Sequence, residues 1–360
     1  MPKTILVEPY PGGHRSQAVA NVAAVAARTG DVLVLTSKGA SEDPTFQEYL
    51  GHTDHPVEEC FSSLYPSTME VAREIASRAD RHTTVVVMDA DQALKRWWYA
   101  APLAFGVRRR PRVVFMLTRY PAKLALTDWV GWKLRVPKAL LALVAMCTGS
   151  LHRVAGFAGR DDMTQGWIVK RTRDPAICTA HSQDRAALRE ELGLDPDRRI
   201  VGIFGGVSER KYPDLVWDAL QTRKIEADLL LAGGLSDGVA AWVEATPGSS
   251  QSSIVLRPGF LSNEVLDKLV AAADVVALAM TNNGPSGIMG KALAAGVPVV
   301  TAGSEVRAQE TRATGAGETA DFNAESIGAA IERALQVDAL RPSTVPPATA
   351  EEFAERILGI

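Results

Sequence analysis

Glycine residues follow most of the apolar, strand-like runs of this 360-residue sequence. A residue without a Cβ lets backbone N–H groups come close to a phosphate, and the first N–H groups of a following helix are free to bind an anion. Such loops are typical of sites for phosphorylated ligands, although a tight turn between strand and helix explains any single loop about as well. The glycines are Gly12-Gly13, Gly205-Gly206, Gly233-Gly234, Gly259 and Gly303.

Two cations accompany the second of these loops. In "GGVSERKYP" Arg210 and Lys211 follow Gly206 and precede a predicted helix. The helix dipole disfavours a cation at a helix start, so a solvated surface charge explains Lys211 poorly. We therefore expect Lys211 to bind a phosphate, with Arg210 as a possible substitute.

The segment "NNGPSGIMGKALAAGVPVV", residues 282–300, predicts a short helix between a loop and a strand. Ser286 is suited to cap a helix over residues 287–295, and Gly296 is suited to end it. The N–H groups of Gly287 and Ile288 would remain free to bind an anion. The predicted buried face of this helix comprises Ile288, Met289, Ala292 and Leu293.

Lys291 is predicted to lie off that buried face, one helical turn beyond Gly287. Helical side chains lean back toward the N-terminus, so a lysine here is long enough to bring its ammonium beside an anion bound at the first turn. We expect Lys291 to bind a phosphate or an acidic group of a ligand. An exposed structural lysine is the alternative.

Two familiar phosphate loops are excluded. A dinucleotide fingerprint requires GxGxxG after the first strand, and "PGGHRSQA" lacks it. A P-loop requires GxxxxGK followed by Ser or Thr, whereas Gly290-Lys291 is followed by Ala292. Hydride transfer and NTP hydrolysis thereby lose their main support.

Strand and helix patterns alternate along the whole chain. "TILVEPY", "DVLVLTS", "TTVVVMDA" and "RVVFMLT" predict buried strands in the first half, and "RIVGIFGG", "ADLLLAGG", "SIVLRPG", "ADVVALAM" and "VPVVTAG" predict them in the second. Helix-length segments separate the strands, and such βαβ units imply parallel sheets covered on both faces. Ligands bind such sheets at the carboxyl ends of their strands.

The predicted class is α/β, with two Rossmann-like domains facing a cleft. We assign residues 1–195 to an N-terminal domain and residues 196–345 to a C-terminal one, with a hinge near Asp195 to Arg198, where turn residues and charges gather. Residues 346–360 predict a terminal helix, capped by Thr349, that packs back on the N-terminal domain.

Composition narrows the class of partner. Lys and Arg total 39 against 42 Asp and Glu, so no net basic field favours nucleic acid. The three cysteines are far apart and have no clustered histidines, so no metal site is predicted. The longest apolar run, residues 139–147, is well short of the roughly 20 needed to cross a bilayer, and the N-terminus lacks a signal-peptide core. We expect a cytoplasmic protein with a small-molecule partner.

The sequence resembles the GT-B glycosyltransferases, in particular the retaining family 4, whose donors are nucleotide sugars. "GIFGGVSERKYPDLVWDAL" is similar to the family's diphosphate-binding segment, and "KALAAGVPVVTAG" resembles its "EALACGLPVVAT" ending. The resemblance is good from Arg199 to Gly303 and thin in the N-terminal half, where it rests on the first strand and Gly12-Gly13. It implies a donor site in the C-terminal domain and an acceptor site in the N-terminal one.

The resemblance also assigns single residues. Lys211 matches the family's diphosphate-binding lysine, whereas Gly206 stands at the place of its arginine. The family's paired glutamates, which contact the donor sugar and ribose, align with Asn283 and Lys291. Gly284 keeps the motif's glycine, Ser286 replaces its second glycine, and Lys291 would supply the cation that is missing at Gly206.

Polar residues also follow strands of the N-terminal half. His14, after Gly12-Gly13, is suited to face an acceptor or carry a proton, and a capping or surface histidine is the alternative. Asp89 and Asp91, and Arg119 with its neighbour Tyr120, follow two further strands and are acceptor-side candidates. We take His14 and Arg119 as the catalytic candidates.

Tryptophans and basic residues combine in "KRWWYAAPLAFGVRRRPR" and "DWVGWKLRVPKALLALVAMC". The combination would suit a membrane-surface contact or a lipid-linked acceptor. Core helices edged by arginines explain the same residues and are the favoured interpretation.

The predicted reaction is transfer of a hexosyl-type sugar from a nucleotide-diphosphate sugar to an acceptor hydroxyl, without metal or further cofactor and with retention of configuration. Cations and helix N-termini stabilise the diphosphate leaving group in such chemistry. A nucleotide-sugar 2-epimerase and a non-catalytic homologue that binds a nucleotide sugar are the alternatives. The altered glutamate positions favour the last.

Overall fold

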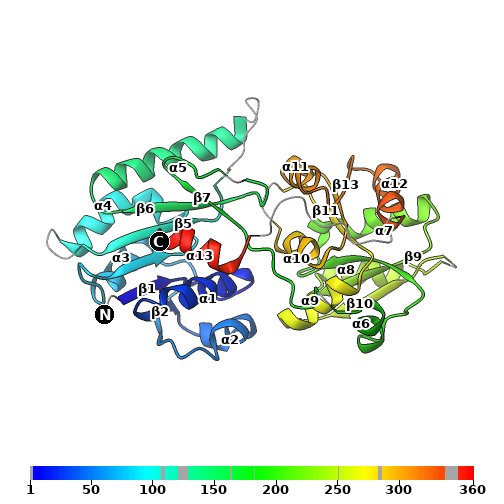
Figure 1. The fold of residues 1–360 in the computed structure, drawn as a ribbon, viewed down its shortest axis with the longest axis horizontal. Coiled ribbons are helices and arrows are strands. Elements are labelled where there is room, and N and C mark those ends of the chain that lie inside the picture. The colour runs from blue at the N-terminus through cyan, green and yellow to red at the C-terminus, as the bar shows by residue number, and fades with distance from the viewer. Residues whose placement is uncertain are drawn as a thin grey trace. The chain divides into compact units, whose positions relative to one another are not determined.

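The computed structural model describes residues 3–106, 110–120, 129–162, 164–181, 183–249, 251–282, 286–336 and 348–360. The chain divides into two compact units (Figure 1). Unit 1 comprises Met1–Asp174 and Ala348–Ile360, and unit 2 comprises Pro175–Pro347. Each contains a parallel sheet with helices on both faces, which confirms the predicted α/β class and the two Rossmann-like domains.

The sheet of unit 1 has the strand order β3-β2-β1-β4-β5-β6-β7, and all neighbouring strands are parallel. The order changes direction between β1 and β4, where the following loops diverge and ligands of such sheets usually bind. The strands are β1 (Lys3–Val7), β2 (Asp31–Ser37), β3 (Val57–Phe61), β4 (Thr84–Val87), β5 (Arg112–Leu117), β6 (Arg153–Ala158) and β7 (Lys170–Arg173).

Two cores flank this sheet. Helices α3, α4 and α5 cover one face, where Trp97 and Phe115 are fully buried, and α1, α2 and α13 cover the other. The helices are α1 (His14–Ala26), α2 (Pro44–Leu50), α3 (Thr68–Ala76), α4 (Leu94–Phe105), α5 (Trp129–Cys147) and α13 (Ala350–Leu358), with a 3-10 turn η1 (Ala40–Glu42).

The terminal helix α13 belongs to unit 1 (Figure 1). It begins after Thr349, whose side chain accepts a hydrogen bond from the Glu352 N–H, as the sequence predicts. Phe353 is 1% exposed and stacks on Phe157 of β6, with 5.7 Å between ring centroids. The apolar side of the helix thus completes the core beneath α1.

The sheet of unit 2 has the order β10-β9-β8-β11-β12-β13 and is also parallel throughout. Its direction changes between β8 and β11. The strands are β8 (Arg199–Phe204), β9 (Ala227–Gly233), β10 (Ile254–Pro258), β11 (Val275–Ala279), β12 (Val299–Ala302) and β13 (Gly317–Ala320).

Helices cover both faces of this second sheet as well. One core lies under α6, α9 and α10, and the other under α7, α8 and α12. The helices are α6 (Arg185–Glu191), α7 (Pro213–Thr222), α8 (Asp237–Ala245), α9 (Asn263–Ala272), α10 (Gly287–Ala295), α11 (Glu305–Thr314) and α12 (Ala324–Leu335), with a 3-10 turn η2 (Glu209–Lys211).

The compact units meet along the chain at Asp174 and Pro175, whereas the sequence pattern predicts the boundary at residue 195. Leu188 and Leu194 are buried in the core of unit 2, which draws the preceding segment into that unit.

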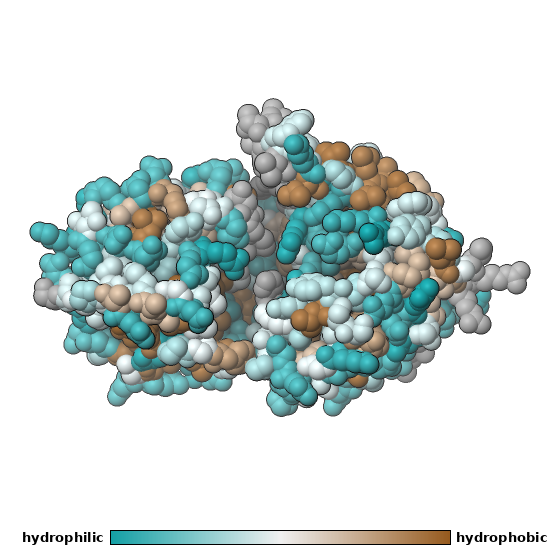
Figure 2. Space-filling view, turned by 180° about the vertical axis from the view of Figure 1, so that it is seen from behind, coloured by the Kyte–Doolittle hydropathy of each residue, from teal (hydrophilic) through white to brown (hydrophobic). Residues whose placement is uncertain are grey.

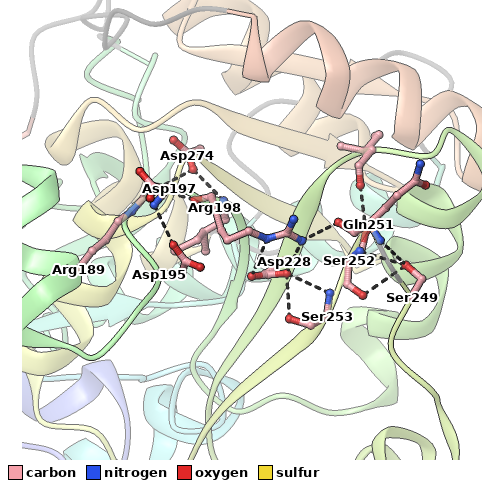
Figure 3. Close-up of polar contacts among 12 residues, drawn as sticks. Arg189, Asp195, Asp197, Arg198, Asp228, Ser249, Gln251, Ser252, Ser253 and Asp274 are labelled. Carbon is pink, nitrogen blue, oxygen red and sulfur yellow. Dashed lines mark hydrogen bonds and ion pairs between the residues drawn. The ribbon is translucent and has the colours of Figure 1, made fainter.

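Hydrogen bonds also fix residues 195–198 to unit 2 (Figure 3). The Arg198 guanidinium lies 2.8 Å from Asp228 Oδ1. The backbone carbonyl of Arg198 accepts a hydrogen bond from the Arg189 guanidinium. Asp274 in turn accepts from Arg189 Nη2 at 2.6 Å. These contacts hold the expected hinge segment on the amino edge of the sheet.

The buried Phe353 side chain of α13 should contribute strongly to the stability of unit 1. Phe353→Ala should lower the free energy of unfolding of unit 1 by about 3 to 5 kcal/mol, because it leaves a cavity against Phe157. Urea unfolding followed by circular dichroism measures the loss. Ile360→Ala, which alters an exposed side chain, is the control, and equal effects of the two substitutions would contradict the buried position of α13.

Candidate functional site

Two glycines set the backbone at the carboxyl edge of unit 2. Gly205 follows β8 with φ +81°, and Gly233 ends β9 with φ +129°. A Cβ on Gly233 would lie 2.2 Å from the Gly205 carbonyl oxygen, so no other residue fits without moving the backbone. The two loops therefore leave neighbouring strands in close contact.

Lys211 reaches back to this glycine loop from η2. Its ammonium donates a hydrogen bond to the carbonyl of Phe204, the last residue of β8. It would lie 3.4 Å from a Cβ on Gly205. This bond uses one of the three N–H donors of the ammonium, and the other two have no partner among the described residues. Lys211 is thereby positioned to bind an anion that approaches Gly205.

Burial lowers the pKa of Lys211 to about 8, and the neighbouring Arg210 lowers it further in the same direction. Keeping the ammonium charged in this buried position therefore costs free energy, and a bound anion would offset that cost. Arg210 itself is exposed, and no protein partner is found for its guanidinium in the described part of the chain. Gly206, beside them, is open to solvent, with nothing within 4 Å of a Cβ built there.

Helix α10 brings its N-terminus to the same edge. It spans Gly287–Ala295, with Ser286 as N-cap and Gly296 in the left-handed conformation at its end, which confirms the prediction from the sequence. Within the described residues the N–H groups of Gly287 and Ile288 have no partner. The Ile288 side chain would lie 4.0 Å from a Cβ on Gly205.

The site that emerges in unit 2 joins three elements: the glycine loop after β8, the ammonium of Lys211 and the first turn of α10. Free N–H groups and an unsatisfied ammonium around a loop without Cβ atoms are the features that bind a phosphate. Asn283 and Gly284, which are predicted from the sequence to join this site, lie outside the described residues.

The expected position of Lys291 is wrong. Its side chain is buried, and its ammonium lies 2.5 Å from Asp267 Oδ1 in α9. Asn263 of α9 also accepts from it, at about the same separation. The expectation failed because α10 is covered nearly all round, so that the side of the helix carrying Lys291 faces α9 rather than solvent.

Asp267 is fully buried and has further partners. Its Oδ2 accepts from the N–H of Thr179 at 2.8 Å and from the Thr179 hydroxyl at 3.0 Å. Lys291 is therefore one member of a network that ties α10 and α9 to the segment after Pro175. A buried charge is retained where such hydrogen bonds satisfy it.

Arg307, which the sequence pattern does not single out, supports the same edge of the sheet. Its side chain is buried in α11, and Nη2 donates to the Met280 carbonyl after β11 at 2.7 Å. Burial lowers the pKa of Arg307 to about 10, against the effect of Glu310. Its only sequence signal was a basic residue four positions beyond Gly303.

Unit 1 has a second polar cluster at the carboxyl edge of its sheet. Arg15 of α1 lies 2.5 Å from Asp89 after β4 and 3.5 Å from Glu8 after β1. Asp89 Oδ1 accepts from the Thr118 hydroxyl at 2.6 Å. Asp89 has φ +43°, a conformation that non-glycine residues adopt at a cost, and these partners hold it there.

Asp91 organises the neighbouring loop. Its Oδ2 accepts from the N–H groups of Thr118 at 2.8 Å and Arg119 at 3.1 Å, and its Oδ1 lies 2.5 Å from Lys138 of α5. Asp89 and Asp91 therefore lie together, as their places after the strand indicated. Glu8, Arg15, Thr118 and Lys138 were missed, because their partners are distant in sequence.

The two catalytic candidates lie at this edge of unit 1. Arg119 is exposed, and its guanidinium has no partner in the part of the chain that the structure describes. His14 is the first residue of α1, directly after Gly13, and its side chain is not described. Gly12 and Gly13 form the turn from β1 into that helix, where Gly13 has φ +68°.

Burial raises the pKa of Glu8 to about 7, although Arg15 and the N–H of Tyr10 act to lower it. A carboxyl of this kind binds its proton more tightly in the fold than in the unfolded chain. Its contribution to stability is therefore present at low pH and is lost as pH rises from 4.5 to about 7.

Over the described residues, no group of three His, Cys, Asp or Glu side chains could hold a metal ion.

Breaking the Lys291–Asp267 pair should destabilise unit 2. Lys291→Met leaves Asp267 buried without its cation, and we expect a loss of about 3 to 5 kcal/mol in the free energy of unfolding, measured in urea. Adding Asp267→Asn removes the unpaired charge and should regain part of the loss. Lys224→Met, at an exposed lysine, is the control. A loss no larger than that of the control would refute the pair's role.

Glu8→Gln should remove a pH dependence of stability. The wild-type chain loses about 3 kcal/mol from this group between about pH 4 and pH 8, and the glutamine does not titrate. The free energy of unfolding of the variant relative to wild type should therefore rise with pH by that amount. Surface Glu42→Gln serves as the control. A difference that stays constant with pH would show that Glu8 titrates normally.

Comparisons with known proteins found a family model that matches part of unit 2 and relatives that match part of the chain. Residues 198–337 match the family model described as "Glycosyl transferases group 1". A D-inositol 3-phosphate glycosyltransferase of Mycolicibacterium gilvum (strain PYR-GCK) is 36% identical over 157 residues, which are 42% of this chain and 33% of that relative. One of Rhodococcus jostii (strain RHA1) is 34% identical over 128 residues, 33% of this chain and 28% of the relative. The chain thus spans about a third of these relatives' length.

Solved structures share the fold of the whole chain. Anabaena HepE in complex with UDP matches with a TM-score of 0.63 and 18% identity, covering 99% of this chain and 95% of HepE. WaaG, a glycosyltransferase involved in lipopolysaccharide biosynthesis, matches with a TM-score of 0.58 and 16% identity, covering 99% and 94%. Residues 198–337 therefore match the group 1 glycosyl transferases, within a chain that has the GT-B fold expected from its sequence.

Proposed function

We propose that the protein transfers a sugar from a nucleotide-diphosphate sugar to an acceptor hydroxyl. The observation that carries this proposal is the meeting of Lys211, Gly205 and the first turn of α10 at one edge of unit 2. The family match over the same unit, residues 198–337, supports it.

The proposed chemistry depends on the leaving group. As the glycosidic bond to the donor breaks, negative charge grows on the nucleoside diphosphate. Lys211, whose ammonium has two donors free of described protein partners, and the N–H groups of Gly287 and Ile288 would stabilise that charge. Arg210 is close enough in sequence to assist. These groups supply charge stabilisation that a metal supplies in other transferases, so we propose a metal-independent reaction with no further cofactor.

The donor's nucleoside is proposed to be uridine, because HepE was crystallised with UDP and with UDP-glucose. Lys291 does not take part in donor binding in this proposal, since its ammonium is committed to Asp267. Retention of anomeric configuration rests on the resemblance to family 4 and is part of the proposal.

The acceptor is proposed to bind at the carboxyl edge of unit 1. The exposed Arg119 and the start of α1 at His14 lie at that edge, together with Asp89 and its partner Arg15. Asp89, held by Arg15 and the Thr118 hydroxyl, is suited to accept a hydrogen bond from an acceptor hydroxyl.

Product analysis tests the proposed reaction. The full chain is incubated with UDP-, GDP- and dTDP-sugars and a set of hydroxyl acceptors, and the products are examined by mass spectrometry. A transferase produces a sugar conjugate and a free nucleoside diphosphate. An isomerised donor would indicate an epimerase, and donor binding without product would indicate a non-catalytic homologue; either would refute the proposal.

Removal of the Lys211 charge should weaken binding of UDP. Lys211→Ala is expected to lose about 1.5 to 3 kcal/mol of binding free energy, the contribution of one charge-assisted hydrogen bond, as measured by calorimetry. Lys224→Ala, which removes an exposed lysine of the same unit, is the matched control. An affinity of Lys211→Ala equal to that of the control would exclude Lys211 from the site.

A further inference from the structure

Helix α5 exposes an apolar face on the surface of unit 1. The residues of this face, called here the α5 face, recur at helical spacing along one side of the helix, and their side chains are 42% to 70% exposed. They are Trp129, Val136, Leu140, Leu143 and Val144. Such a stripe is what a helix normally buries.

Helix α4 packs beside α5 and extends the same surface. Its Trp98, Tyr99 and Leu103 are exposed, and Leu103 is 74% exposed. Figure 2 shows hydrophobic side chains gathered along the upper edge of unit 1, where α5 lies. Exposed apolar side chains that gather on one part of a surface are typical of an interaction site.

The opposite side of α5 is already engaged. Ala142 and Ala145 are fully buried against unit 1, and Lys138 bonds to Asp91 at the carboxyl edge of the sheet. The favoured interpretation of the sequence, a core helix edged by arginines, therefore holds for one side of α5 only. The α5 face is left to solvent.

The charged residues of α4 and α5 have one sign. Neither α4 nor α5 contains an acidic residue, and from Leu94 to Arg160 the sequence carries thirteen Lys and Arg but a single acid, Asp128. The whole chain has a net charge of −3, so this basic segment contrasts with the remainder. Lys133 is exposed and lies 5.6 Å from the Trp129 ring centroid, which places a cation within the apolar stripe.

We propose that the α5 face, with the exposed residues of α4, docks on an anionic lipid surface. Apolar side chains on one helical face enter the boundary between headgroups and acyl chains, and cations beside them pair with anionic headgroups. Trp98, Tyr99 and Trp129 are the residue types that favour this boundary. No helix among the described residues is long and apolar enough to cross a membrane, so the contact is peripheral.

Vesicle co-sedimentation of the full chain tests the proposal. The probes are vesicles of phosphatidylcholine alone and vesicles that also contain phosphatidylglycerol. Wild type should bind the anionic vesicles more tightly, and salt should weaken the binding. Leu140→Ser with Leu143→Ser should weaken it by about tenfold or more. Lys95→Gln with Lys133→Gln should weaken it by about fivefold for each charge removed, and only for the anionic vesicles.

The control is Trp167→Ser, which removes an 87% exposed aromatic residue outside α4 and α5 and should leave binding unchanged. All altered side chains are exposed, so thermal unfolding should match wild type. Failure of wild type to bind anionic vesicles, or equal binding by the leucine variant, would overturn the proposal. Sedimentation velocity adds a further outcome. If wild type forms a dimer that is absent in the leucine variant, and wild type does not bind vesicles, this surface is a protein interface instead.

Discussion

The close approach of two backbone segments at the ends of β8 and β9 governs the candidate site of unit 2. A Cβ on Gly233 would overlap the Gly205 carbonyl oxygen, and Gly205 itself has φ +81°, so glycine is favoured at both strand ends. The space left open beside Gly205 holds the ammonium of Lys211 and the Ile288 side chain at the start of α10. Burial lowers the pKa of that ammonium, and two of its three donors have no partner among the described residues. The proposed stabilisation of a diphosphate follows from this one constraint.

Lys291 occupies a position where the family that the sequence resembles has a glutamate, and this difference affects the packing of α10 as well as any ligand contact. Where the resemblance implies a carboxylate that contacts ribose, this chain has a cation that turns inward to Asp267. That pair, with Thr179 and Asn263, joins α9 and α10 to the segment that enters unit 2. Lys291 thereby ties α10 to α9, and the proposed anion contact uses the backbone N–H groups of the first turn of α10 rather than the Lys291 side chain.

Sequence patterns predicted β2 and α10 well, because β2 is a continuous apolar run and α10 carries both a capping serine and a terminal glycine. Strands β7 (KRTR) and β13 (GETA) went unpredicted, because edge strands without apolar runs have no such signal. The inward turn of Lys291 depends on Asp267, 24 residues earlier, and Glu8 depends on Arg15 and Asp89. Contacts of that range come from packing of helices on a sheet, which spacing alone does not reveal.

In the proposed reaction, the edge of unit 2 stabilises charge and the edge of unit 1 contacts the acceptor.

The most direct test of the central claim is the pKa of the Lys211 ammonium. It is measured by nuclear magnetic resonance of labelled lysines, and the Lys211 signal is assigned with Lys211→Arg. We expect a pKa of about 8 without ligand and a rise to about 10 or above with saturating UDP, because the diphosphate favours the charged form. A Lys211 titration unchanged by UDP, at a concentration shown to saturate the protein, would contradict it.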